Sequence, residues 1–299
     1  MPSVAAWLLA RPYNAVFAIA ITTLMPGLAT ISGAILVFLV LQQERRKALL
    51  TVALAGLLLI VVAVLSGTSP ARVIVGLASS WLPVLGLAWV MRSTRSLTLT
   101  LQLSVLIVLI GNWAFFVFVS DPVRFWQEAI ASTPVLQELR LPELQAAVGA
   151  SAEQFAGVMT TMSAIGVWFG LILVVLLGYW LFQQLPNKSQ EFGRFSDLNF
   201  GRVVALLLAI TSVAGFALNV IWIQSIAFIL FAVFWVQGAA MMHWLRATGV
   251  IPVIVLFAFY ILMIMSLVIV ELGYILPAVA VIGYTDAWFC YRDRVTKQQ

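Results

Sequence analysis

The sequence predicts an all-helical bundle that crosses a membrane about ten times. Two observations on composition predict this class: 63% of the residues are hydrophobic, and only 9% carry a charge. A soluble domain of this size has about 25% charged residues, so the apolar stretches must face lipid rather than a core shielded from water. A third observation is that most of the positive charges fall in every second loop between these stretches.

Spanning helices need roughly 20 mostly apolar residues. The stretches that approach this length are about 48–66, 71–91, 97–119, 158–183, 201–218, 220–244, 250–270 and 273–289. Each of them is expected to form one membrane helix.

The first apolar region, residues 12–41, is interrupted at Pro26 and Gly27. Proline removes a helical hydrogen bond and glycine relaxes the backbone. We expect two segments, 4–25 and 27–41, joined by a tight turn at this break. The alternative is one kinked span, so the count is ten or nine.

Loop charges give the sidedness. One set of loops carries Arg45, Arg46, Lys47, Arg92, Arg95, Lys188, Arg194, Arg202, Arg246, Arg292, Arg294 and Lys297. The alternating set carries only Arg72, Arg124 and Arg140. The positive-inside rule places the first set, and with it the C-terminus, in the cytoplasm. Because the basic residues lie in short loops, the pI of about 9.7 indicates membrane topology rather than nucleic-acid binding.

Two loops are longer than the others. Residues 120–157 lie on the outer side in this map, and the stretch 134–148 has apolar residues at near-helical spacing, as in amphipathic helices on a membrane surface. A long loop of this kind is either a lid over a binding site or an ordered connector. Residues 184–200 form a cytoplasmic linker.

Two stretches resemble a known family. They are LMPGLATISGAILVFLVLQQ, from Leu24 to Gln43, and the C-terminal pair WVQGAAMMHW, from Trp235, and GYTDAWFCYR, from Gly283. Together they resemble the YybS-like family of bacterial multi-pass membrane proteins, which is remotely similar to the S components of energy-coupling-factor transporters. The resemblance implies the bacterial inner membrane, an S-component-like region over 1–183, the linker 184–200, and a C-terminal four-helix region with a basic tail over 201–299.

Polar residues inside the membrane are the candidates for a ligand site, because hydrocarbon offers them no hydrogen-bond partner. Asn112 and Gln237 lie within apolar segments, and Gly238 allows close helix approach. These three are the candidate cavity residues. The alternative is a structural hydrogen bond between helices.

His243, Asp286 and Arg292 form a second candidate group, a clamp between C-terminal helices at the cytoplasmic side. Asp286 is expected to pair with His243, with Arg292, or with Arg294. His243 also fits a simple role at the membrane interface, where cationic groups meet the negative end of a helix.

The sequence contains no GxxxxGK[ST] loop, no HExxH motif and no cysteine cluster. We therefore assign no catalytic residue, metal or cofactor, and expect a protein that is not an enzyme. The main hypothesis is binding or transport of a small molecule or lipid, with a separate energising partner if it works like S components. The rival is a structural or assembly protein of the envelope, which binds a membrane protein partner through its basic loops.

Overall fold

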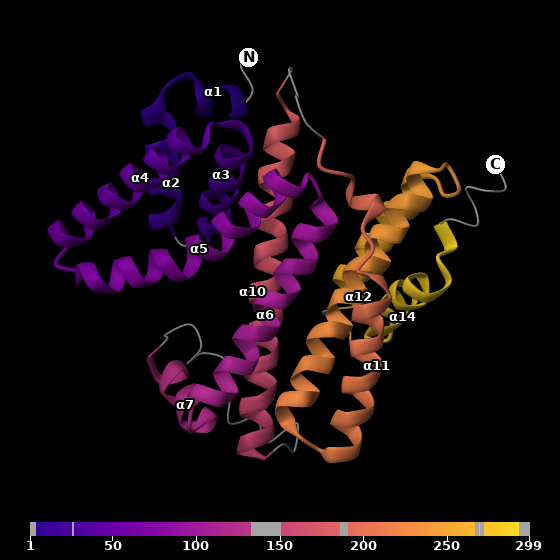
Figure 1. The fold of residues 1–299 in the computed structure, drawn as a ribbon. Helices are drawn as coiled ribbons and strands as arrows, with labels where there is room; N and C mark the ends of the chain where they lie inside the picture. Colours follow the sequence, from indigo (N-terminus) through magenta and orange to yellow (C-terminus); the bar gives the residue numbers. More distant parts are fainter. Residues whose placement is uncertain are drawn as a thin grey trace. The chain divides into compact units, whose positions relative to one another are not determined.

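The structure, a computed structural model, describes residues 4–25, 27–132, 151–185, 191–266, 269 and 272–292. The elements in chain order are α1 (Val4–Ala10), α2 (Pro12–Leu24), α3 (Ala29–Gln42), α4 (Arg45–Leu65), α5 (Pro70–Thr94), α6 (Leu97–Phe118), α7 (Pro122–Ser132), α10 (Ala152–Gln183), the 3₁₀ turn η1 (Phe195–Asp197), α11 (Gly201–Leu218), α12 (Ile221–Ala247), α13 (Val253–Met265) and α14 (Ile275–Phe289) (Figure 1). The predicted all-helical class is confirmed.

Packing divides the chain into two compact units. Unit 1 comprises Met1–Ser104 and Trp168–Gly193, and unit 2 comprises Val105–Val167 and Arg194–Gln299. The boundaries fall inside α6 and α10, so both of these long helices contribute residues to each unit. The units differ from the predicted ranges 1–183 and 201–299, because residues 105–167 pack with the C-terminal helices rather than with the N-terminal ones.

Helix α3 forms the core of unit 1. Every residue from 32 to 41 is buried, and a helix buried on all sides must be apolar on all sides. It contacts α2, α4 and α5. Helix α10 also approaches it closely, since a Cβ atom on Gly178 would lie 2.7 Å from the carbonyl oxygen of Ala34. Only glycine at position 178 permits this approach without a shift of the backbone.

The broken first region has two breaks rather than one. At the predicted break, α2 ends at Leu24, α3 begins at Ala29, and Gly27 takes the positive φ of 82° that favours glycine; Pro26 itself lies outside the described residues. The expectation of one continuous segment over 4–25 is wrong, because α1 and α2 meet at a bend of 117°. Arg11 is extended there (φ −145°, ψ 140°), as expected for a residue before proline.

Basic residues cluster at one end of unit 1. Arg92 donates hydrogen bonds to the carbonyl oxygens of Val40 and Gln43, at the C-terminus of α3. The guanidinium of Arg45 lies 4.5 Å from the ring centroid of Trp89. A cation is favourable at the negative end of a helix dipole. Arg45 and Arg92, which come from the first two basic loops of the sequence, therefore lie at the same end of this unit. The alternation of basic and less basic loops predicts this arrangement.

Helix α12 forms the core of unit 2, with α11 and α14 packed beside it (Figure 1). Two glycines permit the contact between α12 and α14. A Cβ atom on Gly238 would overlap the carbonyl oxygen of Val279, and one on Gly283 would overlap that of Phe234. Gly238, predicted to allow close helix approach, does so here.

Within the described residues, 6 helices are long and apolar enough to cross a membrane, or 7 if the bent α1–α2 pair counts as one span. The predicted total of about ten is not confirmed over these residues, because α3, α13 and α14 are shorter apolar helices. At about 1.5 Å per residue, the 14 residues of α3 extend over roughly 21 Å, less than the hydrocarbon thickness of about 30 Å.

The two long predicted loops contain ordered structure. In the outer loop 120–157, α7 forms near the beginning and α10 starts before the loop ends; the stretch 134–148 lies outside the described residues. In the linker 184–200, the described part includes η1 and the buried side chains of Phe192 and Phe200.

Candidate functional site

A neutral cluster of polar side chains joins three helices of unit 2. It consists of Asn112 on α6, Thr161 on α10 and Ser225 on α12, all buried. The Ser225 hydroxyl donates to Asn112 Oδ1 at 2.9 Å and lies 2.8 Å from the Thr161 hydroxyl, which donates to it. In hydrocarbon such bonds hold helices together, because each polar group lacks any other partner.

One polar atom of this neutral cluster has no hydrogen-bond partner among the described residues. Asn112 is only 4% exposed, and in the described part of the chain its Nδ2 has no hydrogen-bond acceptor. A buried donor without a partner costs about 1–3 kcal/mol. Each such group therefore calls for an explanation, and a ligand is one of the explanations.

Asn112 lines a pocket of about 350 Å³. Its walls come from α6, α7 and α10 and are Ile107, Val108, Gly111, Asn112, Phe115, Phe125, Trp126, Thr160, Ser163, Ala164 and Val167. Ligand sites for small molecules are concave, mostly apolar and about 300–1,000 Å³ in volume, with a few placed polar groups. This pocket has that character, and we refer to it as the Asn112 pocket.

Helix α7 covers one side of the Asn112 pocket. Asp121 caps its N-terminus, since Asp121 Oδ1 accepts a hydrogen bond from Arg124 N at 2.9 Å, and Pro122 begins the helix. Trp126 Nε1 donates to the Thr160 hydroxyl at 2.8 Å. Phe125 packs edge to face against Phe115, with ring centroids 5.1 Å apart. The amphipathic helix is thus held over the pocket by its aromatic face.

A charged cluster connects α12, α14 and the segment before α11. Gln237 Oε1 accepts a hydrogen bond from Phe200 N at 2.8 Å, and Gln237 Nε2 donates to Asp286 Oδ2 at 3.2 Å. The same carboxylate oxygen lies 3.2 Å from Arg292 Nη2. Arg292 Nη1 donates to the carbonyl oxygen of Ser196 at 2.6 Å. Gln237 and Asp286 are fully buried, and among the described residues the second carboxylate oxygen, Asp286 Oδ1, has no hydrogen-bond partner.

The fold of the C-terminus brings Arg292 back to Asp286. Helix α14 ends at Phe289, and the next residue, Cys290, adopts a left-handed conformation with φ 49°. The chain reverses there, and Arg292 returns to the helix it has just left. Sequence proximity alone suggested this pair, and the reversal is what makes it possible.

His243 is not a member of the charged cluster. Its Nε2 lies 2.6 Å from the Tyr260 hydroxyl on α13, and its ring packs edge to face against Phe195. Among the described residues no hydrogen bond or ion pair joins His243 to Asp286. Of the predicted alternatives, Asp286 pairs with Arg292 and not with His243, because His243 faces α13 and η1, whereas Asp286 faces α12 and Arg292.

The three candidate cavity residues thus have different roles in the structure. Asn112 lines a pocket, whereas Gln237 is occupied by Phe200 and Asp286, and Gly238 serves the contact between α12 and α14. Sequence reasoning missed Thr160, Thr161, Ser225 and Trp126. Serine and threonine in helices commonly bond their own backbone, so only the position of Trp126 in an amphipathic segment gave a usable signal.

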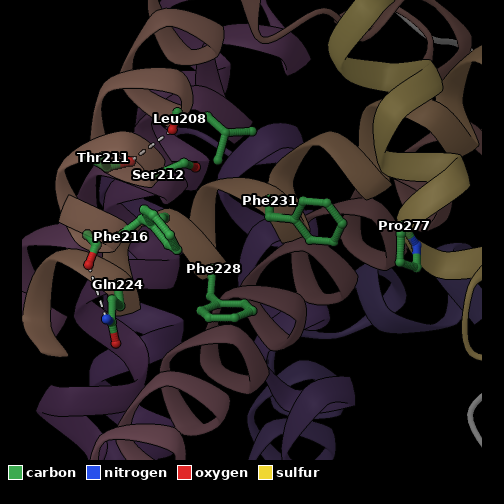
Figure 2. Close-up of a pocket in the computed structure, with 10 residues that line it drawn as sticks. Leu208, Thr211, Ser212, Phe216, Gln224, Phe228, Phe231 and Pro277 are labelled. Atoms are coloured by element: carbon green, nitrogen blue, oxygen red, sulfur yellow. Dashed lines mark hydrogen bonds between the residues drawn. The ribbon is translucent and has the colours of Figure 1, made fainter. Parts of the chain in front are cut away.

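A second, larger pocket of about 450 Å³ lies among α11, α12 and α14. Figure 2 shows its lining side chains, including Phe216, Gln224 and Phe228. Gln224 Nε2 donates to the carbonyl oxygen of Gly215 and to Asn219 Oδ1. Phe216 is 91% exposed. We interpret this hollow as a lipid-facing groove, because it is apolar and its amide donor is already used within the chain.

Comparison of the chain with protein-family models, with curated proteins and with solved structures finds no match. The family resemblance of the two quoted stretches therefore stays a prediction.

Proposed function

We propose that this chain is a membrane protein that binds a small molecule or lipid in the Asn112 pocket, as the receptor or carrier part of a transport process. The observation that carries the proposal is the combination of an apolar cavity with one buried amide donor that has no acceptor in the described chain. Several helices long and apolar enough to cross a membrane support a position for this cavity in or beside the bilayer.

The cover supplied by α7 supports the same proposal. The helix belongs to the long segment that sequence analysis assigns to the outer side, and its attachment to α10 includes one hydrogen bond, from Trp126 to Thr160. A short helix held by few contacts can leave and return at low free-energy cost. Such a lid admits a ligand from one side and shields it afterwards.

Native mass spectrometry of the protein, purified in mild detergent from its own membrane, tests the proposal. The variant Ala164→Phe fills the Asn112 pocket, and Ala227→Phe is the matched control, since Ala227 lines the lipid-facing groove instead. We expect a defined molecule to co-purify with the wild type and with Ala227→Phe, and to be lost from Ala164→Phe.

A co-purifying protein with no small molecule would overturn the proposal and favour the assembly role. Retention of the molecule by Ala164→Phe would equally contradict it, because binding would then lie elsewhere. Both variants must elute as the wild type does in size-exclusion chromatography for the comparison to hold.

A further inference from the structure

The chemistry of the Asn112 pocket narrows the class of its ligand, and this inference rests on the proposed function. Among the described lining residues there is no acidic or basic side chain and no histidine. A charged ligand in an apolar cavity needs an opposite charge or several hydrogen bonds to offset its lost hydration. The pocket therefore selects against amino acids, phosphates and carboxylates and favours a neutral molecule.

The hydrogen bonds that Asn112 and Thr160 already make indicate which polar group a ligand of this pocket carries. Asn112 Oδ1 already accepts from Ser225, so the amide presents its NH₂ group as the unused part. Thr160, the other buried polar residue of the lining, is fully used: its hydroxyl accepts from Trp126 Nε1 and donates to the carbonyl oxygen of Ala156. The buried polar groups of the lining thus offer one donor, and the complementary ligand group is an acceptor. The hydroxyl of Ser163, which also lines the pocket, is exposed.

Aromatic side chains define the remaining surface. Phe115, Phe125 and Trp126 pack on one another with ring centroids 5.1–6.3 Å apart. Such rings bind flat apolar groups through their faces and edges. A pocket with this wall and with about 350 Å³ of space fits a compact apolar body better than a highly polar one.

We propose that the Asn112 pocket binds a neutral, mostly apolar molecule through a carbonyl oxygen that accepts a hydrogen bond from Asn112 Nδ2. Because Nδ2 is itself buried, the amide turns toward the cavity when the ligand enters. Two sources share this chemistry: a free apolar ketone-like molecule, and the ester carbonyl of a membrane lipid.

The test uses two tritiated probes of nearly the same shape, methyl naphthyl ketone and isopropenylnaphthalene, which differ by replacement of the carbonyl oxygen with a methylene group. Binding is measured by scintillation proximity on the purified full chain in nanodiscs made of a diether lipid, which contains no carbonyl group. We expect the ketone to bind about three- to tenfold more tightly, the range of one net hydrogen bond.

The variant Asn112→Leu is expected to abolish that preference while the hydrocarbon still binds. Wild type alone already provides the ketone–hydrocarbon comparison, so the test does not depend on how well this variant folds. Equal binding of the two probes by the wild type, with loss of both in Ala164→Phe, would overturn the carbonyl assignment and leave pocket binding intact. Absence of any binding sensitive to Ala164→Phe would overturn the proposed function as well.

The two sources are separated by the lipid of the nanodisc. If the occupant is a lipid ester, diester lipid competes with the ketone and weakens its apparent binding in the wild type but not in Asn112→Leu. If the occupant is a free molecule, the ketone binds equally in diester and diether nanodiscs.

Discussion

The neutral cluster of Asn112, Thr161 and Ser225 and the charged cluster of Gln237, Asp286 and Arg292 lie in the same unit, and each crosses between helices. They differ in what surrounds them. Each cluster has a buried atom without a hydrogen-bond partner among the described residues, Asp286 Oδ1 in the charged cluster and Asn112 Nδ2 in the neutral one. The difference is that Asn112 lines a pocket, whereas the charged cluster is enclosed by backbone groups of Phe200 and Ser196. The charged cluster holds segments together, and the neutral cluster sets a polar side chain beside a cavity.

The largest expected effect breaks the charged cluster. Arg292→Met leaves the Asp286 carboxylate buried without its cation, and removing one partner of a buried ion pair costs about 3–5 kcal/mol. We expect the free energy of unfolding, measured by titration with sodium dodecyl sulfate, to fall by that order. The double variant Asp286→Asn with Arg292→Met is the control, because it removes both charges and should recover much of the loss. A double variant no more stable than Arg292→Met would show that Arg292 acts through its packing instead.

The sharpest comparison between the two clusters exchanges each amide for leucine. Gln237→Leu leaves Phe200 N–H without its acceptor and removes a donor from Asp286, so we expect a loss of about 2–3 kcal/mol. Asn112→Leu removes one hydrogen bond, that from the Ser225 hydroxyl to Asn112 Oδ1, and a donor that has no acceptor among the described residues, so we expect a smaller loss of about 0.5–1.5 kcal/mol. The same titration measures both. Equal losses would mean that Asn112 is as structural as Gln237, and would weaken the assignment of the pocket.

The contact of α12 with α14 brings the charged cluster together, and Gly283→Ala tests it. The new methyl group would overlap the carbonyl oxygen of Phe234, and overpacking of this kind costs about 1–3 kcal/mol. Gly166→Ala on α10 is the matched control, since nothing lies within 4 Å of its Cβ position. We expect that control to be neutral or more stable by about 0.5–1 kcal/mol. Similar losses in both variants would indicate that backbone propensity, and not helix contact, sets the effect.

Local patterns predicted much of the helical fold. The segment 220–244 corresponds to α12, 71–91 to α5, and the break near Pro26 falls between α2 and α3. The bend at Arg11 was also readable, because Pro12 follows it. The shortness of α3, α13 and α14 was not, since apolar runs do not show where a backbone leaves the helical conformation.

The candidate site was predicted only in part. Asn112 and Gln237 look alike in sequence, as single amides in apolar helices, and for both the sequence left open a place in a cavity or a structural hydrogen bond between helices. The neighbouring segment decides which amide lines a cavity. Gln237 accepts a hydrogen bond from Phe200 N–H, whereas Asn112 accepts one from the Ser225 hydroxyl and lines the pocket. His243 was placed correctly near the end of its helix, but its partner, Tyr260, comes from a helix whose orientation no local pattern specifies.

The smallest expected effect concerns this third polar contact, between His243 and Tyr260. Both side chains are only partly buried, so water or headgroups can replace the lost partner when Tyr260→Phe removes the hydroxyl. We expect a loss of about 0.5–1.5 kcal/mol, the net worth of one ordinary hydrogen bond, well below that of Arg292→Met. His243→Phe should cost about the same, and the double variant should cost little more than either one, because the two single changes remove the same bond. Additive losses would instead show that the two side chains contribute independently of each other and not through this shared hydrogen bond. The expected losses thus follow the burial and the charge of each polar contact, and what distinguishes Asn112 is that a buried donor without a partner among the described residues belongs to a side chain that lines a pocket.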